Sequence, residues 1–369
     1  MSAHNSQHNW TSSLQEVYTN ILPILTKYGY TLDDNQPHTK GERFLMQAVT
    51  TTSGEKIILF GVHTASRTRV VIKVASDSAG RKELRHERTC RTLLHTIDFA
   101  YTPFVSPEEL DFIETATHTL SIQVYIAQTQ NFLERPITEQ FTFALQAFTT
   151  QEGARATTYG HLKNITNTFG NRESTDYIKL FQTFTKEIIA ILPDNHNLQK
   201  DLLETEVLLM HHEERIAQYC GFLTHTDFVP HNFRIADDVM YLLDFSSLLF
   251  GNKYEGWARF INFMALHHPQ LAQYLEQYVV DNRAPEEVMS LHLMRLYRLG
   301  EIIRYYAGTL EKSSGDLHAL NAARIDFWHQ VLIATRNNEP VSEDVRQQYI
   351  QLRDQLRSTD EHERQKDLL

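Results

Sequence analysis

Residues 221–251 read GFLTHTDFVPHNFRIADDVMYLLDFSSLLFG, and the rest of the chain is best interpreted outward from them. Three side chains with acceptor oxygens lie in this stretch at short spacings: Asp227, Asn232 and Asp244. The runs 233–235 and 240–245 are rich in apolar strand formers, and the polar residues 236–238 between them predict a β-hairpin. Such a hairpin carries Asn232 at the start of its first strand and Asp244 at the end of its second. We therefore expect the three oxygen-bearing side chains to lie together at its open end.

Oxygen ligands in this arrangement suit phosphoryl transfer. In that chemistry one carboxylate takes the proton of the attacking hydroxyl, while an amide oxygen and a second carboxylate hold the Mg²⁺ that bridges the nucleotide phosphates. The alternative interpretation is a surface hairpin with scattered acids, which a motif match without structural context does not exclude.

The stretch also matches a family pattern, H-G-D-x-x-P-x-N followed by a hydrophobic-Asp-aromatic strand end. The matching residues are His225, Asp227, Pro230, Asn232 and Leu243-Asp244-Phe245. The chain thus resembles the aminoglycoside phosphotransferase and choline kinase family, which are small-molecule kinases with a protein-kinase-like fold. It departs from the pattern at Thr226, where the family usually has glycine.

The resemblance implies a role for each matching polar residue. Asp227 is expected to be the catalytic base, and Asn232 and Asp244 are expected to bind Mg²⁺. His225 is expected to brace the backbone of the loop. His231, inside the loop, is a further candidate for contact with the substrate.

Composition bounds the class of protein. A length of 369 residues predicts two lobes, and 41% hydrophobic and 22% charged residues are ordinary values for a globular chain. The formal net charge of −11 argues against nucleic acid or an anionic membrane as a partner, and it slightly favours a cationic substrate.

Other features are consistent with a cytoplasmic protein. Cys90 and Cys220 are not in metal or redox spacing, which favours reduced thiols over a disulfide. The polar N-terminus lacks the apolar core of a signal peptide, and no apolar run is long enough to span a membrane. The 19 histidines include two adjacent pairs, but these lack the spacing of a zinc site.

The N-terminal part alternates between helix and strand patterns. A leading helix is predicted over residues 13–28, and strands over 44–50, 56–63 and 69–75. Lys73 lies in the third strand, and residues 79–95 predict the main helix of this lobe. The family resemblance implies that Lys73 contacts the nucleotide phosphates and pairs with Glu87 of that helix, with Glu83 as the competing partner.

Further nucleotide contacts are expected from two loops. The turn between the first two strands contains Ser53 and Gly54, whose hydroxyl and backbone N–H groups are candidates for phosphate contacts, although a plain β-turn is equally compatible. Residues 97–117 look irregular, and strands at 118–128 and 140–148 complete a five-stranded sheet. The polar segment after residue 148 then resembles the hinge of the family, which makes the backbone of Gln146, Ala147 and Phe148 a candidate for contacts to adenine.

From residue 154 onward helical patterns dominate. We therefore predict an α+β, two-lobed, protein-kinase-like fold: residues 1–148 form a nucleotide-binding lobe with a five-stranded antiparallel sheet and one main helix. Residues 149–357 form a helical lobe for catalysis and substrate, and residues 358–369 a disordered tail.

These features together predict an ATP- and Mg²⁺-dependent phosphotransferase acting on a hydroxyl of a small molecule. Aminoglycosides, amino-alcohols, sugars and amino-acid hydroxyls all remain open as acceptors. The alternative is a kinase-like nucleotide-binding module without activity, which Thr226 and the absence of a glycine-rich loop would favour. A protein kinase is disfavoured because the chain lacks that loop and an activation segment.

Overall fold

The computed structural model describes residues 17–34, 36, 56–96, 105–152 and 159–357. Within these residues the chain forms two compact units. The first takes the residues up to Arg85 and Pro107–Ala127, and the second takes the described residues of His86–Ser106 and all of those from Gln128 to Arg357. All described residues after Ala127 therefore belong to the second unit, whereas the boundary was expected at residue 148.

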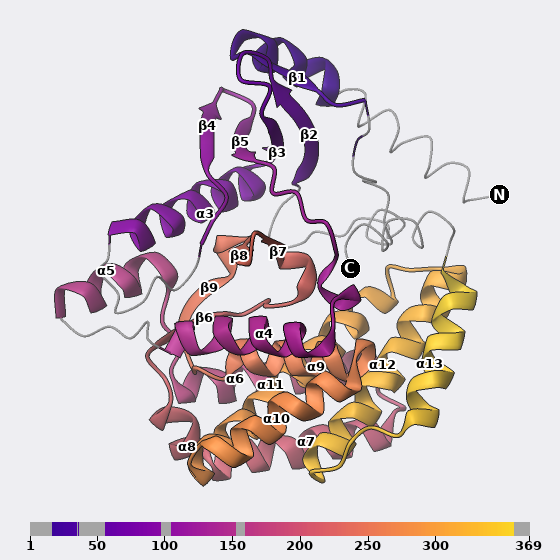
Figure 1. Cartoon of the computed structure of the whole chain (residues 1–369). Coiled ribbons are helices and arrows are strands. Elements are labelled where there is room, and N and C mark those ends of the chain that lie inside the picture. The colour runs from indigo at the N-terminus through magenta and orange to yellow at the C-terminus, as the bar shows by residue number, and fades with distance from the viewer. Residues whose placement is uncertain (1–16, 35, 37–55, 97–104, 153–158, 358–369) are drawn as a thin grey trace. The chain divides into compact units, whose positions relative to one another are not determined.

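The first unit contains a five-stranded sheet in the order β1-β2-β3-β5-β4 (Figure 1). Its strands are β1 (Tyr30–Leu32), β2 (Ile57–His63), β3 (Arg69–Ala75), β4 (Glu109–Glu114) and β5 (Thr119–Val124). All neighbouring strands are antiparallel. The predicted five-stranded antiparallel sheet is confirmed, although two of its members differ from those expected.

The strand predicted at 140–148 is wrong, because these residues belong to helix α4 (Ile137–Glu152) of the second unit. Threonine and phenylalanine favour strands locally, but the buried residues recur with the period of a helix. They are Gln140, Phe143, Ala144, Phe148 and Gln151.

The sheet is completed by strands that were not predicted. β4 lies in the stretch expected to be irregular, and its acidic residues concealed the strand pattern of ELDFIE. β1 follows the leading helix directly. The strand expected at 44–50 lies outside the described residues.

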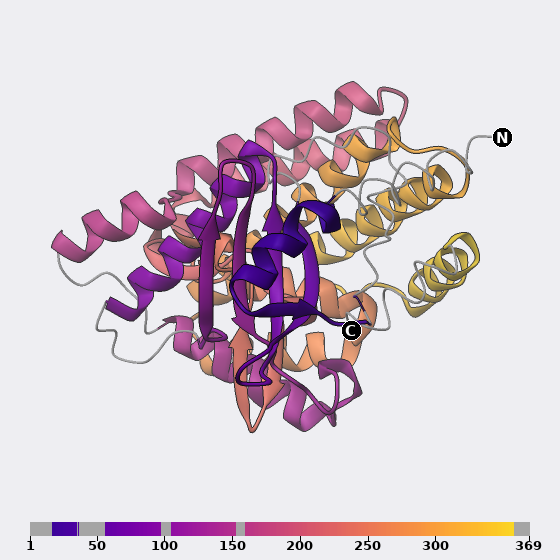
Figure 2. The same ribbon diagram turned by 90° about the horizontal axis from the view of Figure 1, so that it is seen from above.

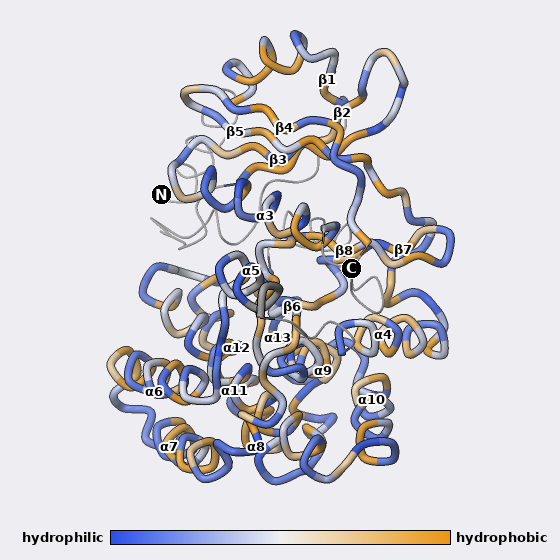
Figure 3. The backbone as a smooth tube through the Cα atoms, turned by 90° about the vertical axis from the view of Figure 1, so that its left-hand side faces the viewer, coloured by the Kyte–Doolittle hydropathy of each residue, from blue (hydrophilic) through white to orange (hydrophobic). Residues whose placement is uncertain are grey.

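One face of the sheet is covered by the leading helix, which is described over residues 17–27 and continues through Pro23 (Figure 2). The strands of this sheet carry many hydrophobic residues, as the colouring of Figure 3 shows. The core of the first unit comprises Ile21, Leu25, Tyr30, Leu59, Val70, Ile72, Val74, Ile113, Leu120 and Ile122.

The opposite face of the sheet is polar, yet it is buried. Thr119, Ser121 and Gln123 alternate along β5 with the core residues, and their exposed fractions are 0%, 3% and 4%. Lys73 is paired with Ser121 across β3 and β5, so it lies on this face, with an exposed fraction of 8%.

Helix α3 (Ser78–Thr96) starts in the first unit and is attached there to the β4–β5 hairpin. The guanidinium of Arg81 donates to the carbonyl oxygens of Thr115 and Ala116 at 2.7 and 2.8 Å, and to Oγ1 of Thr119 at 3.2 Å. Because arginine presents its donors in a rigid fork, these three bonds fix the direction in which α3 leaves the sheet.

The second unit is mostly helical, and its central helix α11 is surrounded by α6, α9 and α12 (Figure 1). The helices other than α4 are α5 (Tyr159–Phe169), α6 (Ser174–Ile191), α7 (His196–His211), α8 (Glu213–Gln218), α9 (Glu255–His267), α10 (Pro269–Asn282), α11 (Pro285–Leu310), α12 (Gly315–Arg336) and α13 (Glu343–Leu356). Pro269 and Pro285 begin α10 and α11, as expected of proline at a first helical position. Among the described residues, no helix combines the length and hydrophobicity needed to cross a bilayer.

Two glycines of α11 provide a test of this packing. A Cβ at Gly300 would clash with the ring of the buried Phe181 on α6, whereas a Cβ at Gly308 would meet nothing within 4 Å. We expect Gly300→Ala to lower the free energy of unfolding by about 1–3 kcal/mol through overpacking. The matched change Gly308→Ala should raise it by up to about 1 kcal/mol, since alanine is the better helix former. Urea denaturation of both variants measures the difference, and equal effects would contradict the α6–α11 contact.

Candidate active site

Short strands of the second unit hold the stretch that contains Asp227, Asn232 and Asp244. β6 (Phe222–His225) pairs with β9 (Leu248–Gly251), and β7 (Phe233–Ala236) pairs with β8 (Val239–Leu242). The predicted hairpin is confirmed as β7–β8, but its second strand ends at Leu242. The loop that carries Asp227 and Asn232, residues 226–232, runs from β6 to the hairpin.

A cluster of buried aromatic rings packs against this loop. Phe228 is completely buried, and its ring lies 5.2 Å from the rings of Phe148 and Phe233 and 5.6 Å from that of Phe260. Burial of aromatic surface of this size contributes several kcal/mol to stability. The loop therefore rests on a rigid floor made by α4, β7 and α9.

Asp227 and Asn232 are joined by side-chain hydrogen bonds. Nδ2 of Asn232 donates to the backbone oxygen of Asp227 at 2.7 Å and to its Oδ2 at 2.9 Å. Since the amide nitrogen is used in both bonds, the amide oxygen of Asn232 points elsewhere, and it accepts no hydrogen bond from the described residues. An amide oxygen left in this way is a suitable ligand for a hard cation.

Asp244 follows the hairpin in a left-handed conformation, with φ 56° and ψ 60°. Its carboxylate accepts hydrogen bonds from the hydroxyls of Ser246, at 2.6 Å, and Ser247, at 3.0 Å. The neighbouring backbone N–H of Leu243 donates to the carbonyl of Asn232 at 2.7 Å, which ties the two predicted metal ligands together through adjacent backbone. The structure thus brings Asp227, Asn232 and the backbone before Asp244 to one end of the hairpin.

His225 braces this end. Its Nε2 lies 3.2 Å from the carbonyl oxygen of Leu243 and 3.1 Å from that of Asp244, so Nε2 must carry the proton that is donated. The ring is completely buried, and burial lowers the pKa of His225 from its ordinary value. A neutral, enclosed ring that donates to two backbone carbonyls holds the backbone of Asp244 in place and is badly placed to act as a base.

Thr226 fits the loop without needing the conformational freedom of glycine. Its N–H and its Oγ1 both donate to the carbonyl of Ser247, at 2.9 and 3.0 Å. Its φ is not positive, unlike that of Asp244. The departure from the family pattern therefore adds a tie between the loop and the segment after Asp244.

Arg259 was not identified from the sequence. It lies on α9, and its Nε donates to Oδ1 of Asp227 at 2.9 Å. The signal was a single arginine in the apolar run WARFINFMAL, because a charge on a buried helix face requires a partner. Burial raises the pKa of Asp227, but Arg259 and then His231 act in the opposite direction and hold it well below its usual range. Asp227 is therefore ionised at neutral pH.

The predicted nucleotide-binding residues fall into three groups. Lys73 lies on the polar face of the sheet in the first unit, and Glu87 is buried, at 3% exposure, in the part of α3 that belongs to the second unit. The competing residue Glu83 forms an ion pair with Lys56. Ser53 and Gly54 lie outside the described residues. The pairing of Lys73 with Glu87 therefore stays a prediction.

The assignment of adenine contacts to Gln146, Ala147 and Phe148 is not retained. These residues lie inside α4, where backbone groups are occupied by helical hydrogen bonds, and the hydroxyl of Thr150 also donates to the carbonyl of Gln146 at 2.7 Å. Phe148 is fully buried and stacks on Trp257 at 4.2 Å. The assignment depended on a strand and hinge that the structure replaces with a helix.

The chemistry of the oxygen set fits magnesium better than zinc. No group of three or more His, Cys, Asp or Glu side chains suited to a metal ion occurs in the described part of the chain. Magnesium commonly uses only one or two protein carboxylates and completes its shell with water and phosphate oxygens. Asp244 and the amide oxygen of Asn232 match that smaller set.

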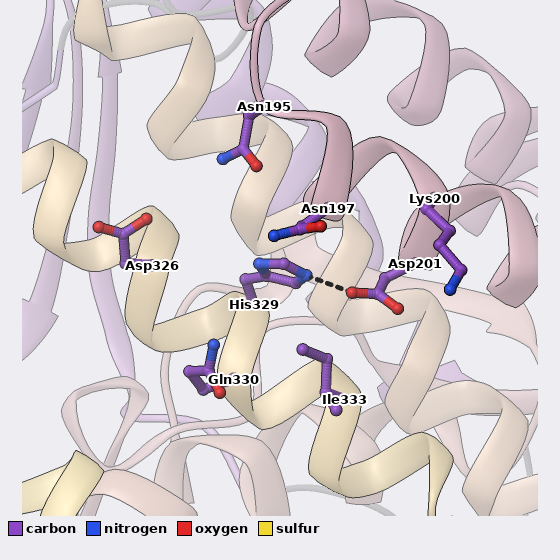
Figure 4. A pocket seen from close by; sticks show the side chains of 8 residues that line it. All are labelled: Asn195, Asn197, Lys200, Asp201, Asp326, His329, Gln330 and Ile333. Atoms are coloured by element: carbon purple, nitrogen blue, oxygen red, sulfur yellow. Dashed lines mark hydrogen bonds and ion pairs between the residues drawn. The ribbon is translucent and has the colours of Figure 1, made fainter.

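A separate polar cavity of about 360 Å³ lies between α7 and α12 (Figure 4). Nε2 of His329 bonds Oδ2 of Asp201 at 2.8 Å there, and Arg336 bonds the other oxygen of Asp201 at 2.7 Å. These ion pairs join the two helices. The cavity shares no residue with the catalytic loop.

One buried histidine of the second unit, His225, and two half-buried ones, His267 and His292, predict acid sensitivity. Burial, the largest cause in each case, lowers the pKa of His225 from 6.5, and lowers that of His267 to about 3 and that of His292 to about 4. Below pH 6.5 the unfolded chain binds protons at these rings while the folded chain does not, so stability is lost as the pH falls. We expect the Tm to decrease steadily from about pH 7 to about pH 4.

The variant His292→Gln should show a shallower decrease, whereas replacing the exposed His95 should leave the slope unchanged. Calorimetry across this pH range measures both slopes. A Tm of the parent protein that does not change between about pH 7 and about pH 4 would contradict the neutral state of these rings.

Comparisons with known proteins bear on the class of this fold. No protein-family model matches the chain, and no curated protein matches its sequence. Solved structures do match: a macrolide 2′-phosphotransferase from Brachybacterium faecium has a TM-score of 0.51 at 12% identity, over 84% of this chain and 98% of its own. An aminoglycoside phosphotransferase from Alicyclobacillus acidocaldarius has a TM-score of 0.51 at 13% identity, over 85% and 93%.

An ethanolamine kinase from Plasmodium vivax is similar to the same degree, with a TM-score of 0.51 at 11% identity over 79% of this chain and 83% of its own. The chain therefore has the kinase-like fold of small-molecule phosphotransferases. The resemblance drawn from residues 225–245 is confirmed at the level of the fold.

Proposed function

We propose that this protein is an ATP-dependent, magnesium-requiring phosphotransferase that moves the γ-phosphate of ATP to a hydroxyl group of a small molecule. The observation that carries the proposal is the arrangement of Asp227, Asn232 and Asp244. The amide of Asn232 binds the carboxylate of Asp227 through nitrogen and keeps its oxygen available, and two serine hydroxyls orient Asp244. In a surface hairpin with scattered acids, the three side chains would not be expected to be held by hydrogen bonds in this way.

In the proposed reaction, the acceptor hydroxyl approaches the carboxylate of Asp227 and its oxygen attacks the γ-phosphorus. The hydroxyl proton passes to Asp227, and the bond between the γ-phosphorus and the bridging oxygen of ADP breaks. Asn232 and Arg259 hold the carboxylate so that it faces the hydroxyl. Mg²⁺, when held by Asn232 and Asp244, would neutralise charge on the phosphates.

Two residues outside the loop complete the proposal. Lys73 would bind the nucleotide phosphates, and Glu87 would position it. The burial of both side chains and the polar face on which Lys73 lies support these roles. Most of the rate enhancement would then come from positioning and electrostatics, with no covalent intermediate.

The inactive nucleotide-binding module remains the second candidate. Of the two features that favoured it, Thr226 no longer argues against activity. Thr226 is accommodated by two hydrogen bonds to Ser247 and strains nothing. The glycine-poor turn around Ser53 and Gly54 lies outside the described residues.

Thermal unfolding with nucleotide tests the proposal. We expect ATP to raise the Tm substantially more with Mg²⁺ than with EDTA, because a ligand that binds only the folded state stabilises it. We also expect release of ADP when a suitable hydroxyl compound is added. A Mg²⁺-independent shift without any ADP release favours the inactive module, and no shift with any nucleotide rejects both.

A further inference from the structure

The side chains around Asp227 show which chemical class of acceptor this site fits. Arg259, Phe263 and His267 are spaced by four residues on α9, so they share one face of the helix, and Arg259 at its start bonds Asp227. This face of α9 therefore begins next to Asp227, the general base of the proposed reaction, and continues toward the C-terminal end of the helix.

A row of rings continues that face back to the catalytic loop. The rings of Phe263 and His267 are stacked at 4.2 Å, and the ring of His231 lies 6.2 Å from that of Phe263. His231 belongs to the loop between Asp227 and Asn232. The surroundings of the base thus include two imidazoles and an arginine beside one apolar ring.

Helix α13 places arginines near this face, and two of them are paired with acids of the same helix, Arg346 with Glu343 and Arg353 with Asp354. Nη1 of Arg346 donates to the carbonyl of Leu266 at 3.1 Å, which ties α13 to the end of α9. Arg353, farther along α13, and Arg357, which follows the last residue of this helix, both lie close enough to His267 to affect its pKa. Burial is the largest cause of the low pKa of His267, and Arg353, Arg357, His231 and Arg259 all lower it further.

The largest charge effects on Asp227 come from cationic side chains. Burial raises the pKa of its carboxyl group, whereas Arg259, His231, Arg298 and His225, in that order, lower it. Arg298 is itself paired with Glu255 and Glu301, so Arg259 is the cation that bonds Asp227 directly. A site for a cationic acceptor would instead place carboxylates around the reacting hydroxyl. The local charge therefore runs against the cationic acceptor that the net charge of −11 slightly favoured.

Arg259 has N–H donors that are not used in the bond to Asp227. Its Nε is used for Asp227, and within the described part of the chain neither Nη makes a hydrogen bond. The side chain of Arg259 is 17% exposed, so part of it is accessible to a ligand. A guanidinium edge of this kind pairs with two oxygens of one carboxylate or phosphate group.

We propose that the acceptor carries an oxyanion, a carboxylate or a phosphate ester, close to the hydroxyl that is phosphorylated, and that Arg259 binds this oxyanion while Asp227 binds the hydroxyl. The inference rests on the proposed function and names its substrate class. The γ-phosphate passes to the hydroxyl oxygen, the proton to Asp227, and ADP leaves. The anionic group of the acceptor is unchanged in the product.

The test compares matched acceptors by ADP release. Glycerate is paired with glyceramide and ribose 5-phosphate with ribose, and ethanolamine represents a cation. We expect at least one anionic member to be preferred over its neutral partner, and the pair that shows the preference distinguishes carboxylate from phosphate. Inhibition of the intrinsic hydrolysis of MgATP by the same compounds provides a second measure of binding.

The variant Arg259→Gln adds a readout that a purely structural role would not change. Loss of a charge-assisted pair should reduce the preference, expressed as the ratio of kcat/KM for the anion to that for its neutral partner, by about 10- to 100-fold. Arg304→Gln is the matched control, because Arg304 is an exposed arginine of α11 paired with Glu187, and its ratio should not change.

Two outcomes would overturn the inference while leaving the proposed function intact. In one, MgATP binds and is hydrolysed, but neutral and anionic partners do not differ in turnover or inhibition, or ethanolamine is preferred. In the other, Arg259→Gln lowers kcat/KM equally for both members of a pair. Absence of any Mg²⁺-dependent binding or hydrolysis of ATP would instead reject the proposed function itself.

Discussion

Replacing Asp227 by Asn is expected to lower kcat for phosphoryl transfer by about 10²- to 10⁴-fold, which is the usual contribution of a positioned general base. The affinity for MgATP should change little, because in the proposed reaction Asp227 faces the acceptor hydroxyl and not the nucleotide. Asparagine keeps an oxygen that can accept from Asn232, so the loop should retain its shape. Steady-state ADP release gives kcat, and equilibrium titration gives the affinity for the nucleotide.

The matched control for this variant is Asp238→Asn. Asp238 lies in the turn of the β7–β8 hairpin, is exposed, and has a φ of 59°, which asparagine also tolerates. It should keep parental activity. Because Arg259 loses its ion partner in Asp227→Asn, the Tm of that variant has to be compared with that of the parent protein. A folded variant that transfers phosphate at the parental rate would show that Asp227 is not the base.

The low pKa of Asp227 has a consequence for the pH dependence of this reaction. Since Arg259 keeps the carboxylate ionised far below neutral pH, the rate should show no acidic limb due to Asp227 between about pH 5 and about pH 8. In the proposed reaction, a carboxylate of such low basicity would orient the hydroxyl and accept its proton only as the new bond forms. This agrees with the loose transition state of phosphoryl transfer, in which little proton removal is needed beforehand.

The second large effect is expected at Asp244. Asp244→Asn should abolish the additional thermal stabilisation that Mg²⁺ confers in the presence of ATP, and it should lower kcat/KM by about 10²-fold or more. Loss of groups that merely support a metal ligand already costs about 10- to 100-fold, and loss of the ligand itself costs at least as much. Asparagine is the appropriate replacement because the backbone there has a φ of 56°.

Ser247→Ala serves as the graded comparison for Asp244→Asn. It removes one hydroxyl that bonds the carboxylate of Asp244 at 3.0 Å but leaves the charge in place, so its effect should be smaller. Melting curves of both variants with ATP, in Mg²⁺ and in EDTA, measure the metal-dependent difference. If Asp244→Asn retains the full Mg²⁺-dependent shift, the ion is held by other groups and the proposed ligand set is wrong.

Much of the site could be predicted from residues close together in the chain. The hairpin and its oxygen side chains lie within 20 residues, and a local turn is enough to bring Asn232 next to Leu243. His225 was expected to brace the loop, and its Nε2 donates to the carbonyl oxygens of Leu243 and Asp244. The five-stranded antiparallel sheet was predicted as an architecture, but β1 and β4 were not expected. The strand expected at 140–148 is helical, and the one expected at 44–50 lies outside the described residues.

The misassignment of α4 has a physical cause. ITEQFTFALQAFTTQE contains strand formers, but its buried residues recur every three or four positions, and packing of Phe148 against Trp257 rewards the helix. Local propensity amounts to a few tenths of a kcal/mol per residue, whereas burying one aromatic side chain contributes about 1.5–3 kcal/mol. The free energy of burial exceeds the local strand propensity, so these residues form a helix. The hinge expected after the strand was therefore wrong as well.

From its order of residues alone, the chain specifies the oxygen-bearing loop, the helical character of its second part and the class of chemistry to look for, because these depend on neighbours within a turn or a hairpin. The sign of the charge around Asp227 depends instead on folding. Arg259 is 32 residues away from Asp227 in the sequence, and it reaches the carboxylate because the start of α9 lies close to β6. Gly256 permits this approach, since it has no Cβ to clash with β6 and its N–H donates to Oγ1 of Thr224 at 3.0 Å. Contacts between distant segments are set by packing, and packing places the guanidinium of Arg259 beside Asp227 in a chain whose net charge is −11.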